Sequence, residues 1–232
     1  MIALSKPSTI AIDGFAGSGK STAAARLAEE LGYLYFDTGV MYRAVTWAVL
    51  EKGVDPGDGE RVSQIAEALT IDVMADGPSD GRQYTVLADD QDITWAIREA
   101  DVEAKVSQVS GYPRVRAVLT EQQRRIAAGG SVVMAGRDVG TVVLPHADLK
   151  IFLEASAQER ARRRYKQLKE HHKPADYERI LAAIIERDKK DKANPVSPTV
   201  PAEDAVILNT DELSIDAVAQ KLHSLVVNAS DA

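Results

Sequence analysis

Short apolar runs alternate with longer stretches of helical periodicity along most of the chain. The first apolar run, residues 9–13, predicts a strand, and Leu27 and Leu31 lie on one face of the helix predicted after it. Further strands are expected at 33–36, 131–135, 149–153 and 205–208, and helices at 20–31, 41–52, 157–169, 177–190 and 215–227. The alternation predicts an α/β fold with a parallel sheet and helices on both faces, and the nearly continuous apolar character of the later strands is typical of buried strands.

Between residues 54 and 130 the pattern changes. Turn clusters at 55–59 and 76–81 flank two short apolar runs, 71–74 and 84–87, which predict short strands. Two helices are expected after them, at 95–110 and 113–128, and Pro113 suits the first turn of the second helix. Short strands and helices inside a βαβ framework predict an inserted subdomain. Three prolines exclude a helix over residues 194–201.

The loop between the first strand and the first helix carries the most informative motif. Gly14, Gly19, Lys20 and Ser21 fit G-x-x-x-x-G-K-[ST] in the strand-to-helix context that this motif requires. Glycines let the backbone approach an anion, lysine adds a positive charge and the serine hydroxyl can reach Mg²⁺. The alternative is a turn that only caps the helix. The motif therefore predicts a phosphate site formed by Gly14, Phe15, Ala16, Gly17, Ser18, Gly19, Lys20, Ser21 and Thr22.

Composition narrows the class of protein. The 232 residues are 45% hydrophobic, which favours one core with insertions, and the net charge of −7 argues against a nucleic-acid or membrane-surface partner. The absence of cysteine excludes disulfides and thiolate chemistry. The N-terminus lacks a signal-type apolar core, and no long apolar run predicts a membrane span. We expect a soluble cytoplasmic monomer.

Polar residues follow the second predicted strand, at the edge where open α/β sheets bind ligands. They are Asp37, Thr38, Tyr42 and Arg43. Thr38 is a plausible N-cap, and Arg43 suits either a ligand contact or a surface ion pair.

Two further pairs of opposite charge are candidates for ligand contacts. Arg137 and Asp138 come directly after a predicted buried strand, where a guanidinium beside a carboxylate suits both a phosphate and a polar base. An ion pair that stabilises the turn is the alternative. Arg187 and Asp191 are one helical turn apart, and they form either a salt bridge or a pair that binds a hydroxyl.

Three arginines share a face of the helix predicted at 157–169. Arg160, Arg163 and Arg164 have the i, i+3, i+4 spacing that would let them close over a triphosphate. The alternative is a solvated charged face in which Glu159 pairs with Arg163.

Several other classes are excluded by missing motifs. The N-K-x-D and D-x-x-G segments of regulatory GTPases are absent, and no nucleophile elbow or metal-type histidine spacing occurs. Phosphoryl transfer to a small acceptor remains as the reaction class.

The order and spacing of several motifs resemble the bacterial cytidylate kinase family over essentially the whole chain. The motifs are Asp37-Thr38-Gly39-Val40-Met41-Tyr42-Arg43, Ile97-Arg98, Val106-Ser107-Gln108-Val109, Pro113-Arg114-Val115-Arg116, Gly136-Arg137-Asp138-Val139-Gly140-Thr141 and Glu186-Arg187-Asp188. The resemblance implies transfer of the γ-phosphoryl group of ATP to CMP or dCMP, with Mg²⁺ as cofactor. A kinase for UMP or AMP, or an ATP-binding module without transfer activity, are the alternatives.

The resemblance also implies roles and domains. Lys20, Arg137, Arg163 and Arg187 would be catalytic, Arg160 and Arg164 would join the phosphate loop in ATP binding, and Ser21 would contact the metal. CMP would be bound by Asp37, Thr38, Tyr42, Arg43, Ser107, Arg116, Arg137, Asp138, Arg187 and Asp191. Residues 1–64 and 130–232 would form the P-loop core, with a lid at about 156–173, and residues 65–129 the inserted monophosphate-binding subdomain.

One position departs from the family pattern. Asn194 stands where the family usually has an arginine that helps to bind phosphate. We expect weaker acceptor binding than in relatives unless Lys190 or Lys192 substitutes, so Asn194→Arg should lower the KM for CMP.

Overall fold

The computed structural model describes residues 6–75 and 77–230. The expectations for the first five residues and for Asp76 in the second turn cluster lie outside the described residues. The chain divides into two compact units: one spans the chain up to Leu31 and from Val133 onward, and the other spans Gly32–Val132.

A five-stranded sheet has the order β2-β6-β1-β7-β8. Its strands are β1 (Thr9–Gly14), β2 (Leu34–Asp37), β6 (Val132–Gly136), β7 (Leu149–Glu154) and β8 (Val206–Asn209). β1 runs parallel to β7 with Ile12 opposite Ile151, and β7 runs parallel to β8 with Phe152 opposite Ile207. The non-consecutive strand order requires crossover connections, which helices provide. The expected α/β fold with a parallel sheet is confirmed.

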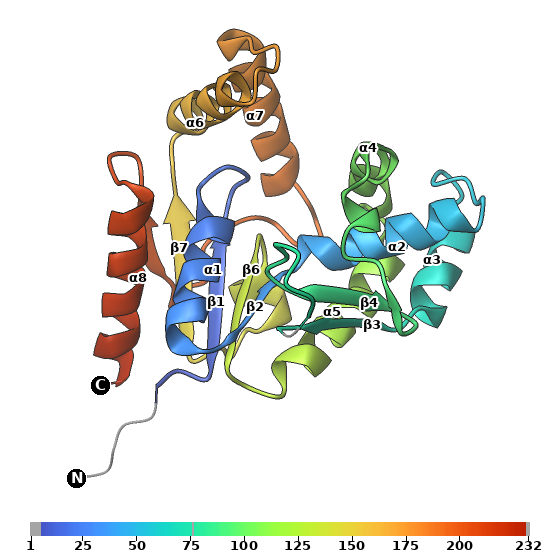
Figure 1. Ribbon diagram of the computed structural model, residues 1–232, viewed down its shortest axis with the longest axis horizontal. Coiled ribbons are helices and arrows are strands. Elements are labelled where there is room, and N and C mark those ends of the chain that lie inside the picture. Colours follow the sequence, from blue (N-terminus) through green and yellow to red (C-terminus); the bar gives the residue numbers. More distant parts are fainter. Residues whose placement is uncertain (1–5, 76, 231–232) are drawn as a thin grey trace. The chain divides into compact units, whose positions relative to one another are not determined.

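Four α-helices lie in the described residues of the first unit. They are α1 (Lys20–Leu31), α6 (Ala157–Glu170), α7 (Tyr177–Lys192) and α8 (Ile215–Ser230). Within this unit α1 packs against α8, and α6 and α7 form a helical hairpin beyond the carboxyl end of β7 (Figure 1). No residue of α7 is buried, so few apolar contacts hold the hairpin in place.

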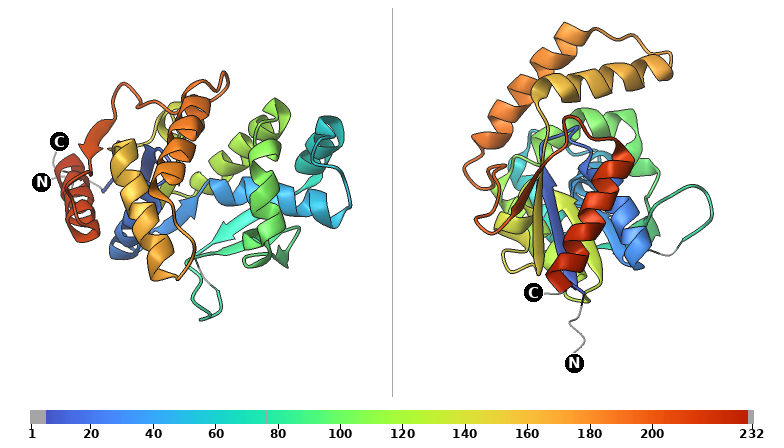
Figure 2. Two further views of the ribbon diagram at one scale, coloured as in Figure 1. Left: turned by 90° about the horizontal axis from the view of Figure 1, so that it is seen from above. Right: turned by 90° about the vertical axis from the view of Figure 1, so that its left-hand side faces the viewer.

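The second unit combines helices with a small antiparallel sheet (Figure 2). The helices are α2 (Gly39–Glu51), α3 (Gly59–Ala68), α4 (Ala100–Val109) and α5 (Pro113–Ala127), with the single turn η1 (Ala96–Arg98) before α4. The sheet consists of β3 (Ile71–Met74), β4 (Thr85–Ala88) and β5 (Gln91–Asp92). Within this unit α2 packs against α3 and α4, and α5 packs against α3 and β3.

The prediction of a single helix at 95–110 is wrong. Glu99 is extended, with φ −64° and ψ 154°, and separates η1 from α4. Asp101 and Glu103 then occupy the first turn of α4, where negative charge is favoured near unpaired amides.

The helix α3 was missed in the loop-like region after residue 54. Its start is marked by Asp58, whose carboxylate accepts a hydrogen bond from the Arg61 amide at 3.1 Å. The neighbouring turn residues concealed this N-cap signal.

The expected burial of the last strand is also wrong. Val206 and Ile207 of β8 are 39% and 53% exposed, because β8 lies at one end of the sheet order. An apolar run alone therefore did not distinguish an edge strand from a buried one. Across the described ranges, the helices are all too short or too polar to cross a bilayer.

Candidate active site

The phosphate loop adopts a conformation that requires glycine at two positions. Gly14 has a φ of 151° and passes so close to β7 that a Cβ would collide with the carbonyl oxygen of Leu153. Gly19 has a φ of 90° and directly precedes α1. Lys20 Nζ donates to the carbonyl oxygen of Phe15 at 3.2 Å, which holds the lysine side chain over the loop. The predicted strand, loop and helix context of the motif is therefore present.

A buried carboxylate that the sequence reasoning did not select supports this loop. Asp13, 4% exposed, accepts hydrogen bonds from the amides of Val139 at 2.8 Å and Gly140 at 2.7 Å. Burial raises the pKa of Asp13 to about 6, against the lowering effect of these two amides. The side chain thereby joins the start of the phosphate loop to the segment that carries Arg137 and Asp138. The sequence signal that could have identified Asp13 was its position at the end of an apolar strand.

Arg160 is a buried connector between α6, α7 and the phosphate loop. Its side chain is 3% exposed and forms an ion pair with Asp188 of α7. The same guanidinium donates to the carbonyl oxygen of Ala16 at 3.1 Å and lies 5.5 Å from the ring centre of Phe15. Arg160 is therefore not part of a solvated charged face, the alternative considered for this helix.

The side chain of Arg163, from α6, contacts the phosphate loop directly. Its Nη1 donates to the carbonyl oxygen of Ser18 at 3.3 Å, and its Nε donates to Glu159 at 2.8 Å. The expected Glu159–Arg163 pair is therefore present together with the loop contact. Thr210, which the sequence reasoning missed, also contacts both Arg163 and Ser18.

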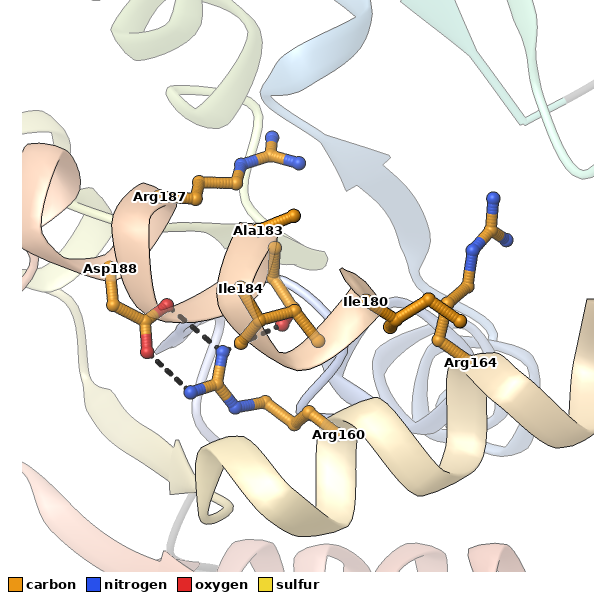
Figure 3. Close-up of a pocket in the computed structure, with 8 residues that line it drawn as sticks. Arg160, Arg164, Ile180, Ala183, Ile184, Arg187 and Asp188 are labelled. Carbon is orange, nitrogen blue, oxygen red and sulfur yellow. Dashed lines mark hydrogen bonds and ion pairs between the residues drawn. The ribbon is translucent and has the colours of Figure 1, made fainter. Parts of the chain in front are cut away.

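A cavity of about 240 Å³ lies between α6, α7 and the phosphate loop. Arg164 of α6 and Arg187 of α7 line this cavity together with the apolar side chains of Ile180 and Ile184 (Figure 3). Cations above an apolar surface suit a ligand with both anionic and flat apolar parts, as a purine nucleotide has.

Arg137 and Asp138, the pair predicted at the carboxyl edge of the sheet, lie in different surroundings. Arg137 Nε lies 2.9 Å from a carboxylate oxygen of Asp191, an ion pair that the sequence did not predict. Asp138 is 6% exposed and precedes a π-helical turn, η2 (Val139–Val143).

Asn194, the position that departs from the family pattern, accepts hydrogen bonds from the amides of Val196 and Ser197 at 3.0 and 3.1 Å, which closes a turn after α7.

The second unit gathers its own set of predicted residues around α2. Arg43 forms an ion pair with Glu103 of α4, and Ser107 follows Glu103 by one turn of the same helix. The Arg116 guanidinium lies 5.2 Å from the ring centre of Tyr42. The surface ion pair considered for Arg43 is thus present within this unit.

The start of α2 is capped differently from the expectation. Thr38 occupies the N-cap position, but its side chain forms no capping hydrogen bond. Asp37 accepts from the Gly39 amide at 2.9 Å instead.

A buried tyrosine accompanies these residues and was also missed. Tyr84 packs against Tyr35 with ring centres 5.6 Å apart. Burial raises the pKa of Tyr84 to about 12, helped by the charge of Asp37 and opposed by Arg98 and Arg43. The phenol therefore stays protonated and can act as a hydrogen-bond donor among charged groups.

The predicted site residues thus divide between the two units. The first unit contains the phosphate loop, Arg137, Asp138, Arg160, Arg163, Arg164, Arg187 and Asp191, and the second contains Asp37, Thr38, Tyr42, Arg43, Ser107 and Arg116. Within residues 6–75 and 77–230, no three histidine or acidic side chains form a metal cluster. Ser21, in the first turn of α1, offers a hydroxyl, and an oxygen donor of this kind suits Mg²⁺.

The parallel sheet and the phosphate loop define the protein as a P-loop nucleotide-binding protein. A family model described as cytidylate kinase matches residues 10–228. Three relatives named cytidylate kinase come from Chloroflexus aggregans, Herpetosiphon aurantiacus and Roseiflexus castenholzii, at 52%, 47% and 47% identity. The matches cover 90%, 96% and 98% of this chain and 89%, 96% and 97% of the relatives. The chain belongs to the cytidylate kinase family, and it is an enzyme.

Proposed function

We propose that this protein transfers the γ-phosphoryl group of ATP to CMP or dCMP, giving ADP and the diphosphate. The phosphate loop, with Lys20 held on it and Arg163 at the Ser18 carbonyl oxygen, is the observation that carries the proposal. Family membership supports the choice of a cytidine nucleotide as acceptor.

The donor nucleotide binds to residues of the first unit in this proposal. Backbone amides of residues 14–22 surround the β and γ phosphates, and Lys20 and Arg163 neutralise charge on the group in transit. Arg160 and Arg164 complete ATP binding from α6. Because the acceptor phosphate is already a nucleophile at neutral pH, no strong general base is required.

The acceptor is assigned to a second set of residues in this proposal. Arg43 and Arg137 bind its phosphate, Ser107, Arg116 and Asp138 contact the cytosine, and Arg187 with Asp191 contacts the sugar. Asp37, Thr38 and Tyr42 support this site. We propose that residues 65–129 act as the monophosphate-binding subdomain and residues 156–173 as the lid that excludes water.

The ion pairs of Arg43 with Glu103 and of Arg137 with Asp191 bear on this proposal. A bound phosphate would compete with these carboxylates for the guanidinium groups, because phosphate accepts charge-assisted hydrogen bonds strongly. Arginine is suited to such an exchange because its planar fork matches both kinds of oxygen acceptor.

Mg²⁺ is the proposed cofactor, and Ser21 is the residue that would contact it. When bound, it neutralises phosphate charge; the ion prefers oxygen ligands and retains several waters. The Ser21 hydroxyl, in the first turn of α1, would fit such an ion because Mg²⁺ prefers oxygen ligands. We also propose that the protein is cytoplasmic and monomeric.

A coupled assay of ADP release tests the reaction and its acceptor. CMP, dCMP, UMP, AMP, GMP and dTMP are compared at equal concentration with ATP and Mg²⁺. We expect CMP and dCMP to give the highest kcat/KM. A higher kcat/KM with UMP or AMP would replace the proposed acceptor, and no ADP release with any of the six would favour a binding module.

The matched control is Lys20→Met, which removes the charge and preserves the length of the side chain. Turnover should fall by several orders of magnitude with an unchanged circular dichroism spectrum, because charge neutralisation accounts for most of the catalysis in this reaction class. Near-normal turnover of this variant would contradict the mechanism.

A further inference from the structure

Thr210 is a buried residue at which three parts of the first unit meet. It follows β8, is fully buried, and belongs to no motif that the sequence singled out. Its hydroxyl lies 3.0 Å from the carbonyl oxygen of Glu154 at the end of β7 and 3.3 Å from that of Ser18 in the phosphate loop. One side chain therefore contacts both the sheet and the phosphate loop.

The same residue contacts the arginine of the proposed lid. Arg163 Nη1 donates to the Thr210 hydroxyl oxygen at 3.3 Å, and Nη2 donates to the Thr210 carbonyl oxygen. A threonine hydroxyl has one hydrogen to donate and lone pairs that accept. It can therefore donate to a carbonyl oxygen while it accepts from the guanidinium.

Two further hydrogen bonds hold the Arg163 guanidinium group in place. Glu159, one turn earlier on α6, accepts from Nε at 2.8 Å, and the Ser18 carbonyl oxygen accepts from Nη1 at 3.3 Å. A Cβ added to Gly19 would lie 3.8 Å from Nη1, so the guanidinium lies against the last glycine of the loop.

The start of α6 is attached to the same loop after β8. The Ser156 amide donates to the Asp211 carboxylate at 2.7 Å, and the Thr210 amide donates to the Glu154 carbonyl oxygen at 2.8 Å. The backbone around Thr210 is therefore fixed independently of its hydroxyl group. Loss of the hydroxyl would change the contacts of Arg163 and Ser18 while the loop keeps its other attachments.

We propose that Thr210 is a positioning residue that sets the Arg163 guanidinium against the phosphate loop for phosphoryl transfer. It acts through Arg163 and touches neither substrate. The inference rests on the proposed role of Arg163 in neutralising charge on the transferred group. Small displacements of such a group reduce turnover because the charge must coincide with the oxygens of the transition state.

The test is a double-mutant cycle in the full-length enzyme with Thr210→Val, Arg163→Ala and both together. Valine has nearly the shape of threonine but lacks the hydroxyl group. We expect Thr210→Val to lower kcat about tenfold or more with the KM for CMP unchanged, and Arg163→Ala to lower kcat about a thousandfold. The double variant should equal Arg163→Ala, because a residue that acts through Arg163 has no effect once the arginine is gone.

Two further variants separate positioning from folding. Thr210→Ser keeps the hydroxyl group and should restore most of kcat. Thr94→Val is the matched control: Thr94 is also fully buried, and its hydroxyl oxygen accepts from the Val86 amide at 2.9 Å. This control should lower the thermal midpoint without lowering kcat.

Each alternative outcome identifies which proposal fails. Unchanged kcat in Thr210→Val, or losses that multiply in the double variant, would overturn the role of Thr210 alone. Normal kcat in Arg163→Ala would overturn the proposed role of Arg163 and with it this inference. Loss of kcat in Thr210→Val that Thr210→Ser does not restore would assign the effect to packing, against the proposal.

Discussion

Asp13 shows at the scale of a single residue how a buried charge can organise a phosphate loop. Its carboxylate accepts hydrogen bonds from two backbone amides of the segment after β6, and Asp13 lies one residue before Gly14. Desolvation nevertheless dominates its titration, so the pKa of Asp13 is raised to about 6. The folded protein therefore binds this proton more tightly than the unfolded chain does.

The raised pKa of Asp13 predicts a specific dependence of stability on pH. Stability contributed by this group is present below the unfolded pKa near 3.8 and is lost as the pH rises through about 6. Relative to Asp13→Asn, the wild type should lose up to roughly 3 kcal/mol of unfolding free energy across that window. Urea unfolding of both proteins at several pH values between about 4 and 7 measures the difference.

Asp204 provides a control of opposite sign. The hydrogen bond that Asp204 accepts from Lys150 lowers the pKa of Asp204, so the stability that it contributes appears as the pH rises. The difference between wild type and Asp204→Asn should therefore be fully present at neutral pH and shrink as the pH falls below the unfolded pKa near 3.8. A flat difference for Asp13→Asn would contradict the titration assigned to Asp13.

At the scale of single residues, the sequence selected candidate side chains but predicted few of their partners. Lys20, Arg163 and Glu159 were selected from motif and spacing, and the Glu159 pair is confirmed. Asp13 and Thr210 were missed because each contacts residues more than a hundred positions away in sequence. No local pattern reports a contact of that separation.

At the scale of an element, a largely buried ion pair joins the two helices of the α6–α7 hairpin. α7 has no buried residue, and the pair is formed by Arg160 and Asp188. Breaking a buried pair by removing one partner is strongly destabilising, since the other charge stays buried alone. Local opening of this hairpin should depend on Asp188.

Asp188→Asn is therefore expected to speed amide hydrogen exchange in α7. The effect should be at least about tenfold, or roughly 1.4 kcal/mol, with little change in β1 and β7. Glu186→Gln is the control on the same helix, because Glu186 pairs with Lys190 at 3.5 Å and both side chains are mostly exposed. Equal exchange rates in the two variants would show that the buried pair does not hold the hairpin.

Element prediction succeeded where a periodic pattern had clear ends. α1 and α5 start at their predicted residues, Lys20 and Pro113. The helix predicted at 95–110 failed at Glu99, where no glycine or proline marks the break. The predicted burial of β8 failed because hydrophobicity along a strand does not encode the strand's place in the sheet order.

At the scale of the whole molecule, the exposed edge strand raises the question of self-association. Unpaired strand edges are templates for pairing with a second chain. Antiparallel pairing of two copies centred on β8 would set Glu203 opposite Glu212, outside the Asp204 carboxylate that Lys150 neutralises. Like charges directly opposite are unfavourable, so the flanking acidic residues protect this edge.

We therefore predict a monomer of about 25 kDa in solution. Size-exclusion chromatography with light scattering over a range of concentrations measures the mass. The double variant Glu203→Val, Glu212→Val removes the outer repelling pair and should show a mass that rises with concentration. A wild-type mass of twice the monomer value would contradict the prediction.

The phosphate loop, the α/β class and the reaction class were determined by the sequence alone. Motif spacing and hydrophobic period are local properties, and local backbone conformation follows from them. Only the tertiary structure decided that Arg160 is buried against Asp188, that Arg137 pairs with Asp191 and that Thr210 joins Arg163 to the loop at Ser18. These contacts depend on how strands and helices distant in sequence pack, because burial and the direction of each side chain arise only when the elements meet.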